Sequence, residues 1–252
     1  MNKKIKIARY ILPGLILLFL LMAYSGFSYL FNCFVIDFSG FQTNDSKVYF
    51  SPSIGKSLQD SLLELVLEAK ARNQSFWGTE PSDYKIIFCA TDKEIKKYAG
   101  NEKHKTATLS NPFTSFIILG KPGYDINIIA HELSHTVLIS KIGYRKKVRT
   151  IPTWFDEGIA LQVDERKKIM DSVLEKNYKT DMNILNQISK PEGFYLKEWD
   201  RSLKNYLVAR YELKLWLRNV NKENLNVFLK SIAKGVDFIS EYEKLKKCTS
   251  LK

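Results

Sequence analysis

The feature that most limits how this chain can fold is an uncharged run, because no Asp, Glu, Lys or Arg occurs from Tyr10 to Ile36. About 20 mainly apolar residues are enough to cross a bilayer as a helix. The tail before the run has cations and no acid, and the positive-inside bias keeps such a tail in the cytoplasm. Its cations are Lys3, Lys4, Lys6 and Arg9. We therefore expect residues 1–36 to form a cytoplasmic basic tail and a transmembrane signal anchor, which places the chain from residue 37 onward outside the cytoplasm.

A cleaved signal peptide is the alternative interpretation of the same run. Residues 11–23 would be its apolar region, and Ala23-Tyr24-Ser25 would supply a small-residue cleavage site. We favour the uncleaved anchor because the apolar run continues past this position and contains Tyr10 and Tyr29 as interface aromatics. Both interpretations predict export, and cleavage would make the protein secreted.

The composition of the whole chain excludes several other classes of protein. A mean hydropathy of −0.22 excludes a polytopic membrane protein, and 13% aromatic residues exclude a disordered chain. Three cysteines make no disulfide framework. A length of 252 residues is enough to bury a core without covalent or metal staples.

The hydrophobic pattern after residue 36 predicts an α+β fold with two lobes. Residues 37–164 are expected to form an upper α/β lobe, and residues 165–252 an α-helical lower lobe. Apolar, β-branched runs predict strands, and 3.6-residue periodicity predicts helices. We expect strands at 48–54, 84–90, 106–109 and 115–119, and helices at 58–71, from a cap at Asp125 to 142, from about 152, at 202–220 and at 225–233.

The strongest chemical pattern is His131-Glu132-Leu133-Ser134-His135, which contains two of only three histidines. Residues four apart on a helix share one face, about 6 Å apart along the axis, so both imidazoles can reach one metal ion. Glu132 projects about 100° away, where it can act as a general base on a metal-bound water. The alternative is a pair of surface histidines on an amphipathic helix that folds without metal.

A catalytic zinc site needs a third protein ligand and keeps one position for water. His104 is one candidate, but its lysine-rich surroundings favour a solvated position. Glu157 lies in the apolar stretch Pro152-Thr153-Trp154-Phe155-Asp156-Glu157-Gly158, where a metal ion would explain a buried carboxylate. Thr153 and Asp156 fit a capping box, and we expect Gly158 to allow close approach to the helix that carries His131.

The order H-E-L-S-H and then P-T-W-F-D-E-G-I-A resembles the gluzincin metallopeptidases, especially the peptidase MA-like family, whose pattern is H-E-x-x-H followed by W-x-x-E-G-x-A. The resemblance is looser outside the two motifs and covers most of residues 48–245. It implies zinc ligands at His131, His135 and Glu157, a catalytic base at Glu132, and a zincin-like fold with a mixed sheet, an active-site helix behind it and a helical lower lobe.

The same resemblance implies a tyrosine that stabilises the oxyanion, for which Tyr206 is the best match and Tyr211 the second. It also implies that the strand at 106–109 binds substrate as an added strand. The resulting hypothesis is a membrane-anchored zinc metallopeptidase with a peptide or protein substrate. A catalytically silent, membrane-tethered interaction protein and an amide hydrolase acting on cell-wall peptides are the alternatives.

A cluster of cations follows the predicted metal helix, and the formal net charge of the chain is +12. The cluster comprises Lys141, Arg145, Lys146, Lys147 and Arg149. A solvated loop at a helix C-terminus is one interpretation, and attraction to an anionic lipid or an acidic substrate is the other. We expect no nucleic-acid partner, because no recognised module interleaves these charges and export removes the usual partners.

Overall fold

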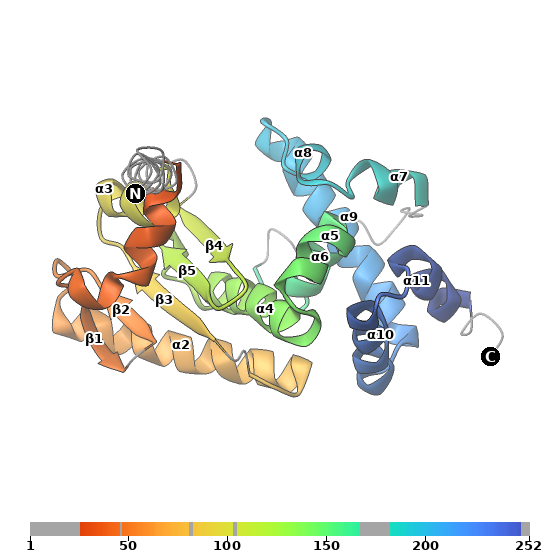
Figure 1. Ribbon diagram of the computed structural model, residues 1–252, viewed down its shortest axis with the longest axis horizontal. Helices are drawn as coiled ribbons and strands as arrows, with labels where there is room; N and C mark the ends of the chain where they lie inside the picture. The colour runs from red at the N-terminus through yellow and green to blue at the C-terminus, as the bar shows by residue number, and fades with distance from the viewer. Residues whose placement is uncertain (1–25, 46, 81–82, 103–104, 167–181, 248–252) are drawn as a thin grey trace, which may run out of the picture.

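The computed structural model describes residues 26–45, 47–80, 83–102, 105–166 and 182–247, and it shows an α+β fold (Figure 1). The expected α+β class is therefore confirmed. The five strands are β1 (Gln42–Asp45), β2 (Val48–Phe50), β3 (Tyr84–Phe88), β4 (Thr106–Ser110) and β5 (Ser115–Leu119). The helices are α2 (Lys56–Trp77), α3 (Asp92–Ala99), α4 (Ile126–Ile142), α5 (Tyr144–Thr150), α6 (Thr153–Ala160), α7 (Met182–Gln187), α8 (Pro191–Phe194), α9 (Trp199–Asn219), α10 (Lys222–Lys234) and α11 (Phe238–Lys247).

The sheet is mixed, with the strand order β1-β2-β3-β5-β4. β3 pairs in parallel with both β2 and β5, whereas β1 and β4 are antiparallel edge strands. The inner strands are apolar on both faces, as expected for strands covered by helices on each side. β2 ends at Phe50 rather than at residue 54, because Pro52 lacks the N–H that would extend the ladder. β1 was not predicted from the sequence.

Each face of the sheet has its own apolar core. Val48, Ile86 and Ile117 point toward α2 and α4 and pack with Leu62 and Leu133. The alternate strand residues point to the opposite face, where they meet α3 and residues 30–36. The sheet thus separates α4, the helix of the H-E-x-x-H pattern, from α3 and the start of the described chain.

The C-terminal helices form a second lobe with an aromatic core. Trp154 and Phe155 of α6 pack there with Trp216, Phe228 and Tyr242 from α9, α10 and α11. The sequence division had placed α6 with residues 37–164, but the buried side chains of α6 contact mainly α9. α4 joins the two lobes, since its first half packs under the sheet and its last half enters the helical core.

The start of the described chain is helical over residues 26–34 and continues into a 3-10 helix, Ile36–Phe38. Leu30, Cys33 and Ile36 pack into the core shared with α3, so the folded unit includes the last part of the predicted anchor. Residues 1–25, which carry the rest of that anchor, lie outside the described residues. Within the described ranges, none of the helices has the length and hydropathy that a membrane crossing needs.

Candidate metal centre

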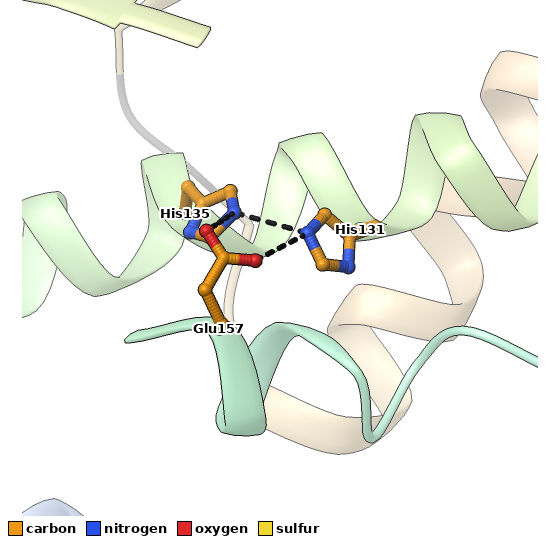
Figure 2. A group of neighbouring side chains, drawn as sticks. All are labelled: His131, His135 and Glu157. Carbon is orange, nitrogen blue, oxygen red and sulfur yellow. Dashed lines mark hydrogen bonds and ion pairs between the residues drawn. The ribbon is translucent and has the colours of Figure 1, made fainter. Parts of the chain in front are cut away.

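His131 and His135 are positioned by α4, whose start is fixed by a side-chain cap. Asp125 accepts hydrogen bonds from the backbone N–H groups of Asn127 and Ile128, at 2.8 and 3.3 Å. One turn separates the two histidines, and both project toward α6, where Glu157 points back at them (Figure 2). All three side chains are buried, and α4 and α6 thus bring together the three residues that the sequence predicted as ligands.

The distances between their atoms fit one metal ion. Nε2 of His131 lies 3.2 Å from Nε2 of His135 and 3.2 Å from Oε2 of Glu157, and Nε2 of His135 lies 3.8 Å from Oε1 of Glu157. Ligands of a tetrahedral zinc at about 2.0–2.1 Å from the metal stand about 3.4 Å apart. Oε2 of Glu157 is buried without a hydrogen bond among the described residues. Two imidazole nitrogens and a carboxylate that converge in this way suit a divalent cation.

Glu132 lies beside this group but does not belong to it. Its Oε2 accepts a hydrogen bond of 2.6 Å from the hydroxyl of Thr108 on β4. The side chain of Glu132 is half-buried, whereas the three candidate ligands are buried. The carboxylate of Glu132 is therefore held at the edge of the site, where a general base would meet water.

The imidazole of His135 is fixed from behind by a carboxylate and a cation. Its Nδ1 donates to Oδ1 of Asp156 over 2.7 Å, and Lys147 reaches Oδ2 of Asp156 at 2.5 Å. This contradicts the expected capping box, because the N-cap of α6 is Pro152 and the Asp156 carboxylate is taken up by His135 and Lys147. A carboxylate behind a metal-binding histidine fixes the ring tautomer and leaves Nε2 free to bind.

The imidazole of His131 has a carboxylate behind it at a longer distance than the one behind His135. Its Nδ1 is 3.7 Å from Oδ2 of Asp164, which is beyond hydrogen-bond distance. Asp164 is fully buried and accepts two hydrogen bonds from Nε of Arg166, at 3.0 and 2.9 Å. The buried guanidinium of Arg210 donates to the carbonyls of Leu161 and Asp164 and so holds this segment after α6.

The charges of the site favour a cation among the three candidate ligands. Burial alone would lower the pKa of His135, but Asp156 and Glu157 outweigh burial and raise that pKa to about 9. Burial alone would raise the pKa of Glu157, but the two imidazoles outweigh it and lower this pKa. Because Nδ1 of His135 is bonded to Asp156, the additional proton would be on Nε2. The carboxylates that favour this proton would equally favour a divalent metal ion at Nε2.

Two tyrosines from the helical lobe approach Glu157. Tyr206 was the predicted oxyanion donor, and its half-buried ring packs edge-on against Phe194. The ring of Tyr206 lies 6.3 Å from the ring of Tyr195, and burial, followed by the negative charges of Glu157 and Glu132, raises the pKa of Tyr206. Tyr195, which the sequence analysis missed, donates its hydroxyl proton to Oε1 of Glu157. No local motif marks Tyr195, because it follows a one-turn helix in a short connection.

Gly158 serves a different contact from the one expected. A Cβ at this position would stand 2.6 Å from the carbonyl oxygen of Ala209 and 3.0 Å from the side chain of Leu213. Both residues belong to α9, so this glycine allows α6 to approach α9 rather than α4. The expected partner of Gly158 was therefore wrong, and the close approach is between α6 and α9.

The cations that the sequence grouped together lie on two helices, α4 and α5. The predicted cationic loop is mostly the helix α5, and Lys147 is engaged with Asp156. Lys141 donates to Oδ1 of Asn226 over 2.9 Å. His104 lies outside the described residues.

Comparison with known proteins gives no assignment. No family model matches the chain, and no curated protein matches it. The function is therefore inferred from the residues of the site and their geometry.

Proposed function

We propose that this chain is a zinc metallopeptidase of the gluzincin type, with His131, His135 and Glu157 as metal ligands and Glu132 as general base. The observation that carries the proposal is the buried convergence of two Nε2 atoms and one carboxylate, with a second carboxylate beside them and outside the set. This is the arrangement that a hydrolytic metal site needs, because the ligand carboxylate and the base must be different groups. Zinc is favoured over calcium or magnesium by the two imidazole ligands.

Bound zinc would lower the pKa of a coordinated water toward 7 and polarise the scissile carbonyl. The chain's own residues supply the other functions. Glu132 would accept the water proton on the carboxylate oxygen not bonded to Thr108, and would pass it to the leaving amine. A phenol of Tyr206 or Tyr195 would donate a hydrogen bond to the oxyanion.

The β4 edge of the sheet supports a peptide substrate, because β4 is the last strand in the described sheet. In the β4–β5 ladder, Gly120 N–H donates to Lys105 O and Asn111 N–H donates to Thr114 O. This register turns the backbone groups of Ala107 and Leu109 toward β5, and those of Thr106, Thr108 and Ser110 away from it. An extended peptide can pair with such an edge. The backbone of Thr108 would then pair with the substrate, while its hydroxyl would stay hydrogen-bonded to Glu132.

The proposed location follows from the sequence. The basic tail and the uncharged run favour a single membrane anchor, with the metal centre on the extracytoplasmic side. The proposed partners are a peptide or protein substrate and the membrane.

The test is Glu132→Gln in the full chain, with Glu64→Gln on the exposed face of α2 as the matched control. We expect the Glu132→Gln variant to bind one zinc per chain and to lose about 10²–10⁴-fold in turnover of a peptide library, because only the proton acceptor is removed. The control should cleave like the original protein. Zinc binding without cleavage by the original chain would instead support the silent interaction protein, and retained turnover in Glu132→Gln would reject the mechanism.

A further inference from the structure

The helix at the start of the described chain has two different faces. Leu30, Cys33 and Ile36 point into the core on the α3 side of the sheet. Polar contacts fix this face as well, since Nδ2 of Asn32 donates to Lys97 O over 3.1 Å and the Cys33 thiol donates to Tyr98 O over 3.3 Å. The orientation of the segment relative to the sheet is therefore determined (Figure 1).

Beside this face lies a row of exposed phenylalanines, Phe27, Phe31, Phe34 and Phe38, which we call the aromatic row. Phe27, Phe31 and Phe34 follow one side of the helix over residues 26–34 and are 60%, 52% and 43% exposed, with the ring of Phe34 also packed edge-on against Phe116 at 5.2 Å. Phe38, which is 90% exposed, ends the following 3-10 helix. Contiguous apolar surface of this kind marks an interaction site more often than scattered single residues do. The row is distinct from the metal centre, because α4 packs on the other face of the sheet.

The sequence on either side of the row indicates its partner. The residues immediately before it belong to the uncharged run that starts at Tyr10, so apolar sequence leads into the row without interruption. The first charge after the run is Asp37, which is bound to Lys85 at 2.8 Å and accepts from the Tyr49 hydroxyl at 2.5 Å. This carboxylate lies in sequence between Phe34 and Phe38, and its charge is partnered by Lys85.

Cations lie on the same side of the sheet as the aromatic row. Lys93, Lys96 and Lys97 are exposed on α3, the helix that packs beside residues 26–34. Apolar residues that enter the headgroup boundary, next to lysines that meet anionic headgroups, are the combination by which proteins lie on a membrane surface.

We propose that the aromatic row lies in the interface of a lipid bilayer, so that the membrane covers the α3 side of the α/β lobe. The lobe is then held against the lipid rather than suspended from a flexible tether. The metal centre, on α4, lies on the opposite side of the sheet from the membrane. This orientation presents the site to substrates in the aqueous phase.

The test measures the depth of single side chains in vesicles of phosphatidylcholine and phosphatidylglycerol that contain the full chain. Nitroxide labels would be placed at Phe27→Cys and Phe38→Cys in a Cys248→Ser background. Cys33 and Cys89 are buried, and burial raises the pKa of the Cys33 thiol to about 12, so these native thiols resist labelling. Leu67→Cys is the matched control, because Leu67 is 64% exposed on α2, on the other side of the sheet.

At positions 27 and 38 we expect collisions with oxygen, which concentrates in lipid, to exceed collisions with a water-soluble nickel chelate. The control at position 67 should show the reverse. Higher nickel accessibility at 27 and 38, or a chain that stays in the aqueous phase, would overturn the proposal. Low accessibility to both reagents would also overturn it, because protein would then cover the row, and dipolar broadening between labels would identify a second copy as the cover. An unchanged circular dichroism spectrum verifies that each labelled chain is folded.

Discussion

The two sides of the candidate metal centre differ in what they contribute. The sheet side, formed by α4 and β4, carries both histidines, the proposed base Glu132 and the hydroxyl of Thr108 that binds Glu132. The helical side, formed by α6 and the segments around it, carries the third ligand and its supports. Apart from the histidines, the sheet side is therefore expected to control turnover, and the helical side to control how tightly the metal is held.

Substitutions on each side test whether one side controls turnover and the other controls metal affinity. If the division is right, changes on the helical side lower metal affinity with little effect on the zinc-loaded enzyme. Changes at Glu132 or Thr108 lower turnover and leave the metal in place. On the sheet side, the Glu132→Gln substitution described above should cause the largest loss of turnover.

Asp156→Asn should produce the largest effect of the helical side. The substitution keeps the shape of the side chain and removes the negative charge that His135 and Lys147 share. Partners behind a metal-binding histidine contribute about 10–100-fold in affinity, so we expect a loss of that size in zinc affinity. Competition with a chromophoric chelator measures it, with Asp60→Asn on the exposed part of α2 as control. An unchanged zinc affinity together with reduced kcat would reverse the assignment of the two sides.

Gly158→Ala tests how closely α6 must approach α9. The added methyl would meet the backbone oxygen of Ala209, which cannot move without shifting the helix. Overpacking of this kind costs about 1–3 kcal/mol of unfolding free energy. Urea unfolding measures the loss. Gly55→Ala is the control, because a methyl there would meet no atom within 4 Å. Equal stability of the two variants would show that the contact between α6 and α9 is not tight.

Thr108→Val removes the hydroxyl that binds Glu132 while keeping a β-branched side chain in the strand. A hydrogen bond to a charged group contributes about 1.5–3 kcal/mol, so we expect kcat to fall at least about tenfold, with KM and zinc content unchanged. Thr108→Ser keeps the hydroxyl and should restore kcat. If the valine and serine variants have the same kcat, the hydroxyl does not position the base.

Tyr195→Phe and Tyr206→Phe separate the two phenols and should give the smallest effects on metal binding. Tyr195 donates to Glu157, so its loss should lower zinc affinity by about threefold, within the range of a single net hydrogen bond. Tyr206 packs beside Tyr195 and is the proposed oxyanion donor, so its loss should lower kcat with zinc retained. Chelator competition and steady-state kinetics on both variants make the comparison. The opposite pattern would make Tyr195 the oxyanion donor.

The same two sides differ in how much of them the sequence revealed. On the sheet side, the information is local, since five consecutive residues on one helix include both histidines and the proposed base Glu132. The strands β3 and β5 were also predictable, because their apolar, β-branched runs stand between clear turns. Short-range periodicity is sufficient for such elements.

On the helical side, the important contacts join residues far apart in the chain. Tyr195 reaches Glu157 across 38 positions, and no local pattern signals that contact. Asp156 was assigned to a cap because the spacing of Thr153 and Asp156 fits one, but tertiary contacts with His135 and Lys147 took its carboxylate instead. The partner of Gly158 was wrong for the same reason, since the sequence shows that a helix can approach closely but not which helix does.

The central claim is that His131, His135 and Glu157 together hold one zinc ion. Zinc K-edge X-ray absorption on the purified full chain tests it most directly, with metal content measured on the same sample. We predict one zinc per chain, with two imidazole nitrogens and with oxygen ligands at about 2.0–2.2 Å, and loss of the carboxylate contribution in Glu157→Ala. A chain without zinc, a sulfur ligand in the first coordination sphere, or a spectrum unchanged by Glu157→Ala would contradict the claim.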